Sequence, residues 1–491
     1  MDHGGAHGRR VFLRAVGIGA AVVGFDAGSR AWATESDTAE AADGLPRLDG
    51  TLLTDPAALA PYAEDFGHLV TGRTPRAVLL PGSVADIAAM IRFCGPRGIE
   101  VAPRGQGHQG YGQAQVEAGL VIDMGPLNAI TVDPGGRTVS VQAGAVWSAV
   151  LTACLAHGLT PPVFTDYIEL SVGGTLSLGG LGGAAHHHGA QVDTVVELDV
   201  VTGTGDVVTC SPTRHADLFH AARAGLGQVG VITRAVLTLV PAHAGVRKYT
   251  LTYTTLSAFV AAQRRTVRDG RFDWLEGAVA AAAGGGWQFQ LEGAVYFDAT
   301  APDDQALIGD LGGEGSPRIE EFDYQGFVDD LAPAIAYLKS TGEWYDPHPW
   351  FEMFLSDEAV ESSVGATLAT LTPADIGASG LILLYPVPTA RLRAPMLRVP
   401  DSELAFLFAV LRTAAPDADA RSAAEMLAAN RALLLKGQAV GGTVYPGGAI
   451  PMTGDDWRLQ YGDQWSVFQA AKRRFDPHGI LTPGQEIFPR G

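Results

Sequence analysis

The sequence of 491 residues contains little cysteine and has no excess of basic residues. Its 3 cysteines, Cys94, Cys154 and Cys210, are too few and too scattered for a disulfide framework or a cysteine-based zinc site. The 34 lysines and arginines are outnumbered by 53 acidic residues, which gives a formal net charge of −19. A protein that binds nucleic acid or an anionic membrane carries a basic excess, so the charge argues against both classes.

Long apolar runs, internal repeats and low-complexity segments are also missing. Beyond the N-terminal segment, no stretch reaches the roughly 18 apolar residues of a membrane helix, so we expect no membrane span. The 62 glycines and 29 prolines together stay below the roughly 25–30% of a low-complexity chain. At roughly 100–200 residues per domain, the length predicts two to four domains. The composition alone does not say why so many glycines are present.

The N-terminal residues have the layout of an export signal. The pair Arg9-Arg10 precedes an apolar run, residues 15–23, and Ala31-Trp32-Ala33 matches a small-x-small cleavage pattern. The paired arginines favour the twin-arginine route, which exports folded proteins. We therefore expect residues 1–33 to be a twin-arginine signal peptide and the protein to be extracellular or periplasmic. The alternative is a chance arginine pair before a disordered tail.

The rest of the chain predicts an α+β protein with two domains. Residues 34–243 mix short strands and helices without a regular βα repeat, as in the buried strand predicted at 77–80 and the helical spacing of Ile87, Met90 and Ile91. Residues 244–454 show longer strands and long helices, which we interpret as a second domain with a sheet covered on one face by helices. Residues 455–491 are expected to close the first domain. The long helices are predicted at residues 256–268, 401–414 and 418–435.

The dinucleotide-binding pattern G-x-G-x-x-G occurs twice, each time in the wrong context. The copy at residues 225–230 follows a predicted helix and precedes a strand, and no helix follows the copy at residues 105–110. A Rossmann site needs a strand, a glycine loop and a helix in that order, so we reject a Rossmann domain.

Two glycine clusters nevertheless predict a ligand site. Glycines alternate in residues 104–110, which lets successive backbone N–H groups converge on a diphosphate. The alternative for this segment is a surface turn with a solvent-facing His108. The second cluster, residues 173–183, is too flexible to stand alone as a surface loop, and Ser171, Thr175 and Ser177 supply hydroxyl donors. Together the clusters favour loops that surround a ligand.

At these residues the chain resembles FAD enzymes of the vanillyl-alcohol-oxidase type, with a PCMH-type FAD-binding domain, and among them the cytokinin dehydrogenases. The resemblance runs from about residue 75 to the end and is sparser in the second domain. It implies a PCMH-type FAD-binding domain plus an antiparallel-sheet substrate domain. The motifs that carry it are Arg104-Gly105-x-Gly107-His108, Thr165-Asp166-Tyr167, residues 225–234, Leu275-Glu276-Gly277, Pro347-His348-Pro349-Trp350 and residues 475–485.

The resemblance also implies an FAD cofactor. His108 would carry one covalent link to the flavin. Some relatives add a link from a cysteine in the second glycine cluster, but no cysteine lies between residues 171 and 185 here. The implied flavin contacts are Gly105, Gln106, Gly107, His108, Gln109, Gln113, Asp166, Ser171, Ser177, Leu181, Ile232, Thr482 and Gln485.

The activity implied by the resemblance is oxidative cleavage of the N6 side chain of an isoprenoid adenine. Hydride would pass from the amine-bearing carbon to flavin N5, and the imine would hydrolyse to adenine and an aldehyde. Asp166 would accept a hydrogen bond from the amine, Glu276 would accept one from the purine at the cavity mouth, and Tyr445 would line the cavity. Oxygen or a quinone would reoxidise the flavin.

Several residues depart from the family pattern on the substrate side. Glu352 stands where an asparagine is common after the Pro-His-Pro-Trp motif, and Phe164 replaces a tryptophan. These departures leave two alternatives open. One is oxidation of an alcohol, sugar or secondary metabolite by the same fold, and the other is a flavin-binding protein without catalysis. The consecutive His186, His187 and His188 point in divergent directions, so we expect no metal site.

Overall fold

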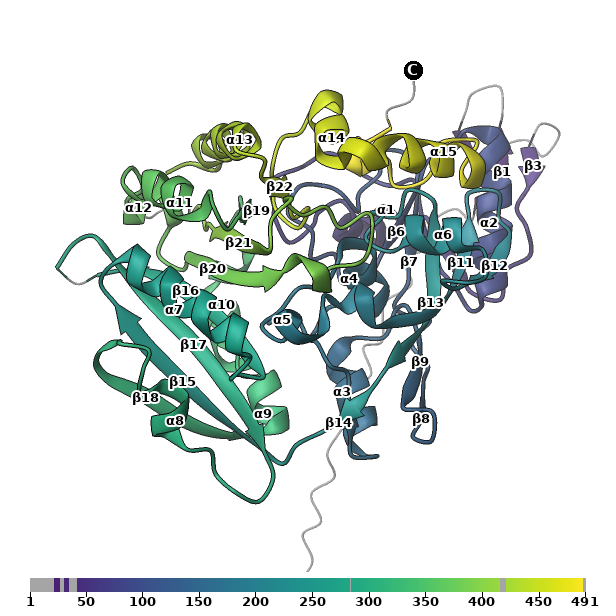
Figure 1. The fold of residues 1–491 in the computed structure, drawn as a ribbon. Coiled ribbons are helices and arrows are strands. Elements are labelled where there is room, and N and C mark those ends of the chain that lie inside the picture. The colour runs from purple at the N-terminus through teal and green to yellow at the C-terminus, as the bar shows by residue number, and fades with distance from the viewer. Residues whose placement is uncertain (1–21, 27–30, 35–41, 283, 416–420, 489–491) are drawn as a thin grey trace, which may run out of the picture.

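The computed structural model describes residues 22–26, 31–34, 42–282, 284–415 and 421–488 (Figure 1). Arg9 and Arg10 of the expected export signal lie outside these residues. At the described N-terminal end, strands β1 (Val22–Asp26), β2 (Ala31–Thr34) and β3 (Ala42–Gly44) form a small antiparallel sheet. No helix among the described residues is both long and apolar enough to cross a membrane.

The first part of the chain forms two main sheets. In the four-stranded sheet β5, β7 and β6 are parallel and β4 is antiparallel, whereas the five-stranded sheet is antiparallel throughout. The strands of the four-stranded sheet are, in order, β4 (Thr51–Leu53), β5 (Ala77–Leu80), β7 (Leu120–Asp123) and β6 (Val101–Arg104). Those of the five-stranded sheet are β12 (Val207–Cys210), β11 (Val195–Thr202), β13 (Gly230–Thr238), β9 (Thr138–Gln142) and β8 (Ile130–Asp133).

Helix α2 (Val84–Arg97) illustrates how the sequence pattern becomes packing. Ile87, Met90 and Ile91 recur at helical spacing, and all three are buried against the sheets. The helix ends where Gly98 adopts a left-handed φ of 65°, which glycine accepts without steric strain.

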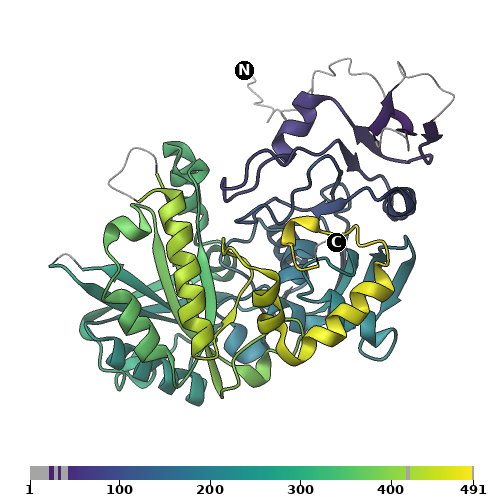
Figure 2. The same ribbon diagram turned by 90° about the horizontal axis from the view of Figure 1, so that it is seen from above.

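The second part of the chain forms an eight-stranded antiparallel sheet. Helices α7 (Leu256–Asp269), α11 (Val360–Leu368) and α13 (Ala423–Ala439) pack on one of its faces (Figure 2). The other face is turned toward the glycine clusters of the first part. In sheet order, the strands are β18 (Glu314–Asp323), β15 (Gly245–Tyr253), β17 (Trp287–Phe297), β16 (Trp274–Ala281), β20 (Leu381–Pro388), β21 (Leu404–Leu411), β19 (Phe351–Ser356) and β22 (Thr443–Val444).

Two expectations for local structure were wrong. Residues 401–414, expected as a helix, contain strand β21, which is apolar on both faces because one face meets the helices and the other meets the first part of the chain. A short apolar run without alternation fits a doubly buried strand as well as a helix. The second glycine cluster is also not a loop throughout, since helix α4 (Val172–Leu178) occupies its first half.

The end of the described chain returns to the first sheets. The backbone of Val101 on β6 exchanges hydrogen bonds with Ile480 and Thr482, at 2.8 and 2.9 Å. Asp476 fixes this segment, because its buried carboxylate accepts hydrogen bonds from two backbone N–H groups and pairs with Lys472 at 2.8 Å. Thr482 and Gln485 thereby come close to the first glycine cluster, while the domain boundaries at residues 243 and 454 stay predictions.

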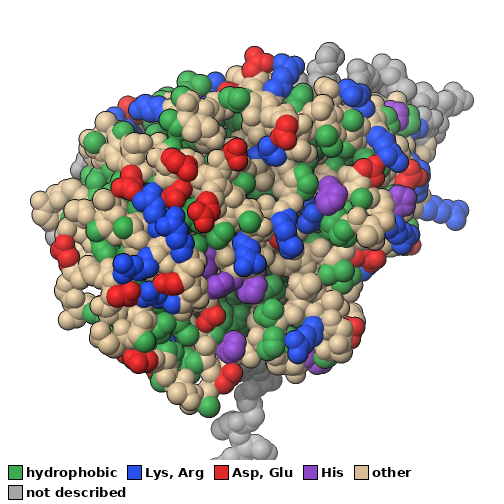
Figure 3. Space-filling view, viewed as in Figure 1, with side chains coloured by type: hydrophobic (Ala, Val, Ile, Leu, Met, Phe, Trp, Pro, Cys, Tyr) green, Lys and Arg blue, Asp and Glu red, His purple; other side chains and the backbone are tan. Residues whose placement is uncertain are grey.

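Charged side chains on the surface are mostly interspersed. Figure 3 shows lysine and arginine side chains next to aspartate and glutamate over the eight-stranded sheet and its helices. Arg264 pairs with Asp357 at 2.6 Å, and Arg271 pairs with Asp310 at 2.5 Å. Such exposed and half-exposed pairs contribute about 0–1 kcal/mol each, so we assign them no functional role.

Candidate active site

A deep cavity lies between the two glycine clusters and the eight-stranded sheet. The first part contributes the loop after β6, the segment before α4, α4 itself and β13. The second part contributes side chains from β19, β20 and β21, and the returning C-terminal segment closes one end. All the implied flavin contacts line this cavity: Gly105, Gln106, Gly107, His108, Gln109, Gln113, Asp166, Ser171, Ser177, Leu181, Ile232, Thr482 and Gln485.

The loop of residues 105–115 is held in place by residues 65–67, a segment without any recognisable sequence motif. Asp65 accepts hydrogen bonds from the backbone N–H of Gly67 at 3.2 Å and of Gly112 at 2.5 Å. The backbone of Phe66 and Gly67 also donates to the carbonyls of Gly107 and Gln109. Burial raises the pKa of Asp65 to about 6. No motif surrounds Asp65, so only the fold reveals this role.

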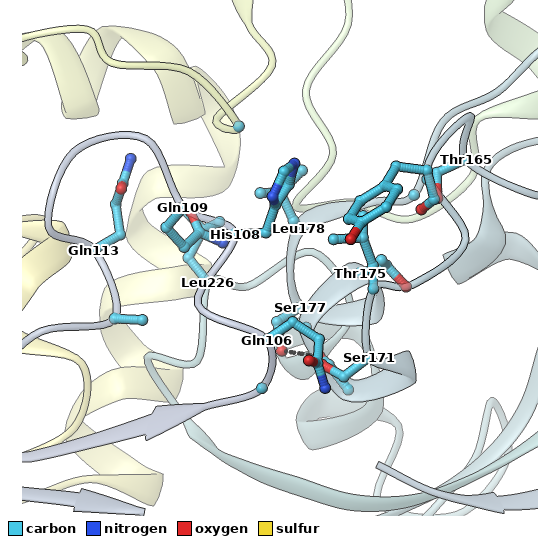
Figure 4. A pocket seen from close by; sticks show the side chains of 18 of the residues that line it. Gln106, His108, Gln109, Gln113, Thr165, Ser171, Thr175, Ser177, Leu178 and Leu226 are labelled. Atoms are coloured by element: carbon cyan, nitrogen blue, oxygen red, sulfur yellow. Dashed lines mark hydrogen bonds between the residues drawn. The ribbon is translucent and has the colours of Figure 1, made fainter. Parts of the chain in front are cut away.

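The cavity wall fits a ligand with a diphosphate and several hydrogen-bonding groups. Arg104 Nη1 and Gln109 Oε1 are buried and have no hydrogen-bond partner among the described residues. Gly105 and Gly174 stand so close to Ser171 that a Cβ would crowd its hydroxyl, and Figure 4 shows Gln106 beside Ser171 and Ser177. Glycines at such positions leave backbone N–H groups accessible to an anion. Residues of this kind fit a bound dinucleotide cofactor.

His108 projects into the cavity from an aromatic cluster. Its ring lies 4.0 Å from Phe66 and 5.1 Å from Tyr167, measured between centroids, and Trp344 and Trp350 flank it at 5.8 Å. Burial, together with the charges of His348 and Lys339, lowers the pKa of His108 to about 3. The imidazole is therefore neutral at physiological pH, with a nitrogen lone pair free to act as a nucleophile.

Asp166 and Glu276 form a carboxyl pair on the side of the cavity formed by the sheet. Asp166 is exposed and lines the cavity, whereas Glu276 on β16 is 7% exposed and does not line it. Neighbours Leu275 and Gly277 face α7, so strand alternation turns Glu276 toward Asp166. The expected contact of Glu276 with a purine at the cavity mouth stays a prediction.

The two carboxyl groups share a hydrogen bond, which requires one of them to be protonated. Burial raises the pKa of both groups, and the charge of Asp166 raises the pKa of Glu276 further. The hydrogen bond lowers the pKa of Asp166 and raises that of Glu276. One proton is therefore shared by the pair, because two carboxylates in contact would repel each other.

Lys248 supplies a positive charge behind the pair. Its Nζ lies 2.8 Å from Glu292 and 3.1 Å from Asp330, and it sits over the ring of Trp274. Glu292 lies directly opposite Glu276 in the pairing of β16 with β17, so the ion cluster adjoins the carboxyl pair. The charge of Lys248 lowers the pKa of both Asp166 and Glu276.

Tyr445 lines the cavity as predicted and has a second, structural contact, and the histidine run is engaged with backbone carbonyls. The hydroxyl of Tyr445 accepts hydrogen bonds from Gly180 N and Leu181 N, both at 3.2 Å, so it anchors the second glycine cluster as well as lining the cavity. His186 lies between the carbonyls of Gly183 and Phe272 at 2.8 Å. In the described ranges, no group of histidine, cysteine and acidic side chains could hold a metal ion.

Residues 75–211 match the family model of an FAD binding domain, and residues 286–488 match the model "Cytokinin dehydrogenase 1, FAD and cytokinin binding". An "uncharacterized oxidoreductase ORF5 in fasciation locus" of Rhodococcoides fascians is 40% identical over 90% of this chain and 99% of its own length. Cytokinin dehydrogenase 7 of Oryza sativa subsp. japonica is 34% identical over 89% and 91%.

A solved structure shows the same fold. The crystal structure of 6-hydroxy-D-nicotine oxidase from Arthrobacter nicotinovorans superimposes with a TM-score of 0.68 over 88% of this chain and 96% of that chain. The two sequences are 20% identical. The likeness therefore establishes the fold alone. The substrate has to be inferred from the residues that line the cavity of this chain.

Proposed function

Since this chain belongs to the cytokinin dehydrogenase family of FAD-dependent oxidoreductases, we propose that it cleaves the N6 side chain of isoprenoid adenines by oxidation. FAD, when bound, supplies the acceptor for the hydride that leaves the amine-bearing carbon. The amine N–H is lost as a proton, and water then hydrolyses the resulting imine to adenine and an aldehyde.

The observation that carries this proposal is the carboxyl pair. A secondary amine needs a group that binds its N–H, fixes the direction of the adjacent C–H bond and takes the proton. Asp166 is such a group, because it is a carboxylate that faces the cavity. Glu276 contributes by holding Asp166 in its ionised form and in one orientation. A flavin-binding protein without catalysis has no use for a carboxyl pair at its cavity.

Product analysis tests the reaction class. The purified protein is incubated with N6-isopentenyladenine and a dye that accepts electrons, and adenine and the aldehyde are assayed. We expect equal amounts of both products. Oxidation of an alcohol or a sugar, with no adenine formed from N6-isopentenyladenine, would show that the same fold serves another substrate.

Replacing Lys248 by methionine is expected to move the pH dependence of the reaction. Asp166 must be ionised to bind the amine N–H, so kcat/KM rises as pH increases through the pKa of the carboxyl pair. Loss of the Lys248 charge removes an influence that lowers this pKa and leaves Glu292 and Asp330 unpaired. We expect the acidic limb of the kcat/KM profile to move up by about 1–2 pH units.

The neighbouring residue offers a matched control for this shift. Arg247 is next to Lys248 on β15 but faces outward, where it pairs with Asp304 at 2.7 Å. Arg247→Met should leave the acidic limb where it is in the wild type. An equal shift in both variants, or none with Lys248→Met, would mean that Lys248 does not act on the carboxyl pair.

We also propose that residues 1–33 direct export by the twin-arginine route, which delivers folded proteins and thus suits a protein that binds its cofactor before export. Arg9-Arg10 and Ala31-Trp32-Ala33 support this. N-terminal sequencing of the protein recovered outside the cytoplasm is expected to begin near residue 34. Unchanged export after replacement of both arginines by lysine would contradict the proposal.

A further inference from the structure

Glu352 is a second carboxyl group that lines the cavity, besides Asp166, and the proposed reaction gives it no task. It lies on β19 between Phe351 and Met353, which point into the core beneath the helices. Strand alternation therefore turns Glu352 to the opposite side, where it lines the cavity together with Asp166 and Tyr385.

The floor beside Glu352 is apolar. In the strand pairing, Glu352 stands opposite Ala409 of β21, and Ala409 stands opposite Leu383 of β20. The next cavity-facing position on β21 is Leu407, which also lines the cavity. A hydrocarbon chain laid along this face would touch the apolar side chains of Leu383 and Leu407, and the polar residues beside it are Glu352 and Tyr385.

The carboxyl of Glu352 has space but no protein partner. A Cβ placed on Gly447 would lie 2.5 Å from Oε2 of Glu352. The carboxyl therefore fits at this place because residue 447 has no side chain. Among the described residues, no hydrogen bond acts on this carboxyl; burial and the charge of Asp166 do. Burial and the charge of Asp166 raise the pKa of Glu352 to about 8, so the group is mostly a neutral acid at pH 7.

A neutral carboxyl can donate one hydrogen bond and accept others. Left unpaired next to a hydrocarbon ligand, it loses its contacts with water and gains nothing in return. A ligand hydroxyl would satisfy both its donor and its acceptor. A site built to bind a hydroxyl group discriminates strongly against the analogue that lacks it.

Resting on the proposed function, we propose that Glu352 determines specificity by hydrogen-bonding a hydroxyl group on the N6 side chain of the substrate. The apolar floor receives the carbon chain, and the carboxyl receives its hydroxyl. The protein then prefers an adenine with a hydroxylated isoprenoid side chain over one with a purely hydrocarbon chain.

The test compares two substrates in the holoenzyme. The kcat/KM for N6-(4-hydroxyisopentenyl)adenine is divided by the kcat/KM for N6-isopentenyladenine. The wild type is expected to favour the hydroxylated adenine, and Glu352→Leu, which keeps the volume and removes the hydrogen-bonding group, is expected to lower the ratio about 10–100-fold. Glu358→Leu, the same change at an exposed residue beyond the end of β19, should leave the ratio unchanged.

Binding without turnover gives a second readout. The dissociation constants of both adenines for the chemically reduced holoenzyme are measured by anaerobic calorimetry. The preference of the wild type for binding the hydroxylated adenine should weaken in Glu352→Leu by about the same factor as the kcat/KM ratio. If Glu352→Leu fails to fold, Gly447→Ala serves instead, because its Cβ displaces the carboxyl and should lower the ratio as well.

Two failures can be told apart. In the first, both adenines reduce the flavin, but the wild type shows no preference for the hydroxylated adenine, or Glu352→Leu and Gly447→Ala keep the wild-type preference. The role of Glu352 is then wrong and the proposed function stands. If neither adenine reduces the flavin, the proposed function is wrong, and the role of Glu352 is wrong with it.

Discussion

Asp166→Asn is expected to slow the reduction of the bound flavin by N6-isopentenyladenine about 10²–10⁴-fold, the usual contribution of a positioned acid–base group. The amide has the shape of the carboxylate and can still accept a hydrogen bond from the amine. It cannot take the proton, and it carries no charge to stabilise the electron-poor carbon as hydride leaves. We expect the loss mainly in kcat, measured as the limiting rate of flavin bleaching in anaerobic stopped-flow.

Two further variants separate the role of Asp166 from a general loss of charge. Glu169→Gln removes an exposed carboxylate close by in the chain and should keep the rate within about a factor of two. Glu276→Gln should slow the reaction less than Asp166→Asn, because its amide N–H can still donate to Asp166. If Asp166→Asn reduces the flavin as fast as the wild type, Asp166 is not the proton acceptor.

His108→Ala is expected to abolish covalent attachment of the flavin. We propose that the imidazole of His108 carries the link, because it is neutral and lines the cavity between aromatic rings. After acid precipitation, the wild-type protein should stay yellow, and its intact mass should exceed that of the chain by the mass of FAD. In His108→Ala the flavin should appear in the supernatant.

His348→Ala is the matched control for this variant. His348 is also buried and stacks on Phe66 at 4.2 Å, but it does not line the cavity. Its removal should leave the flavin attached. Release of flavin from the acid-treated wild type would show that the cofactor is held without a covalent bond.

The parts of the site that could be predicted from the sequence are those set by local motifs. The glycines of residues 104–110 and 173–183 indicate a ligand site, and the resemblance to the flavin enzymes implies that His108 and Asp166 belong to it. The position of Glu276 required more, because it depends on the face that β16 turns to α7. Only the sheet order brings the opposite face of β16, which carries Glu276, next to the segment before α4.

The remaining differences have similar physical causes. Strand β21 lacks alternation because both of its faces are buried, so its sequence resembles a buried helix. Asp65 acts through backbone N–H groups of a distant loop, and backbone donors leave no pattern in a sequence. The carboxyl of Glu352 has room only because Gly447 lies against it, and a contact between residues so far apart in the chain cannot be inferred from either residue alone.

The most direct test of the central claim is a single anaerobic mixing experiment. Purified protein with oxidised flavin is mixed with N6-isopentenyladenine in the absence of oxygen, and the absorbance of the flavin is followed. The carboxyl pair of Asp166 and Glu276 beside the cavity predicts that the flavin bleaches and that one adenine is released per flavin reduced. A flavin that stays oxidised with this adenine, but is bleached by an alcohol or a sugar, would contradict the claim.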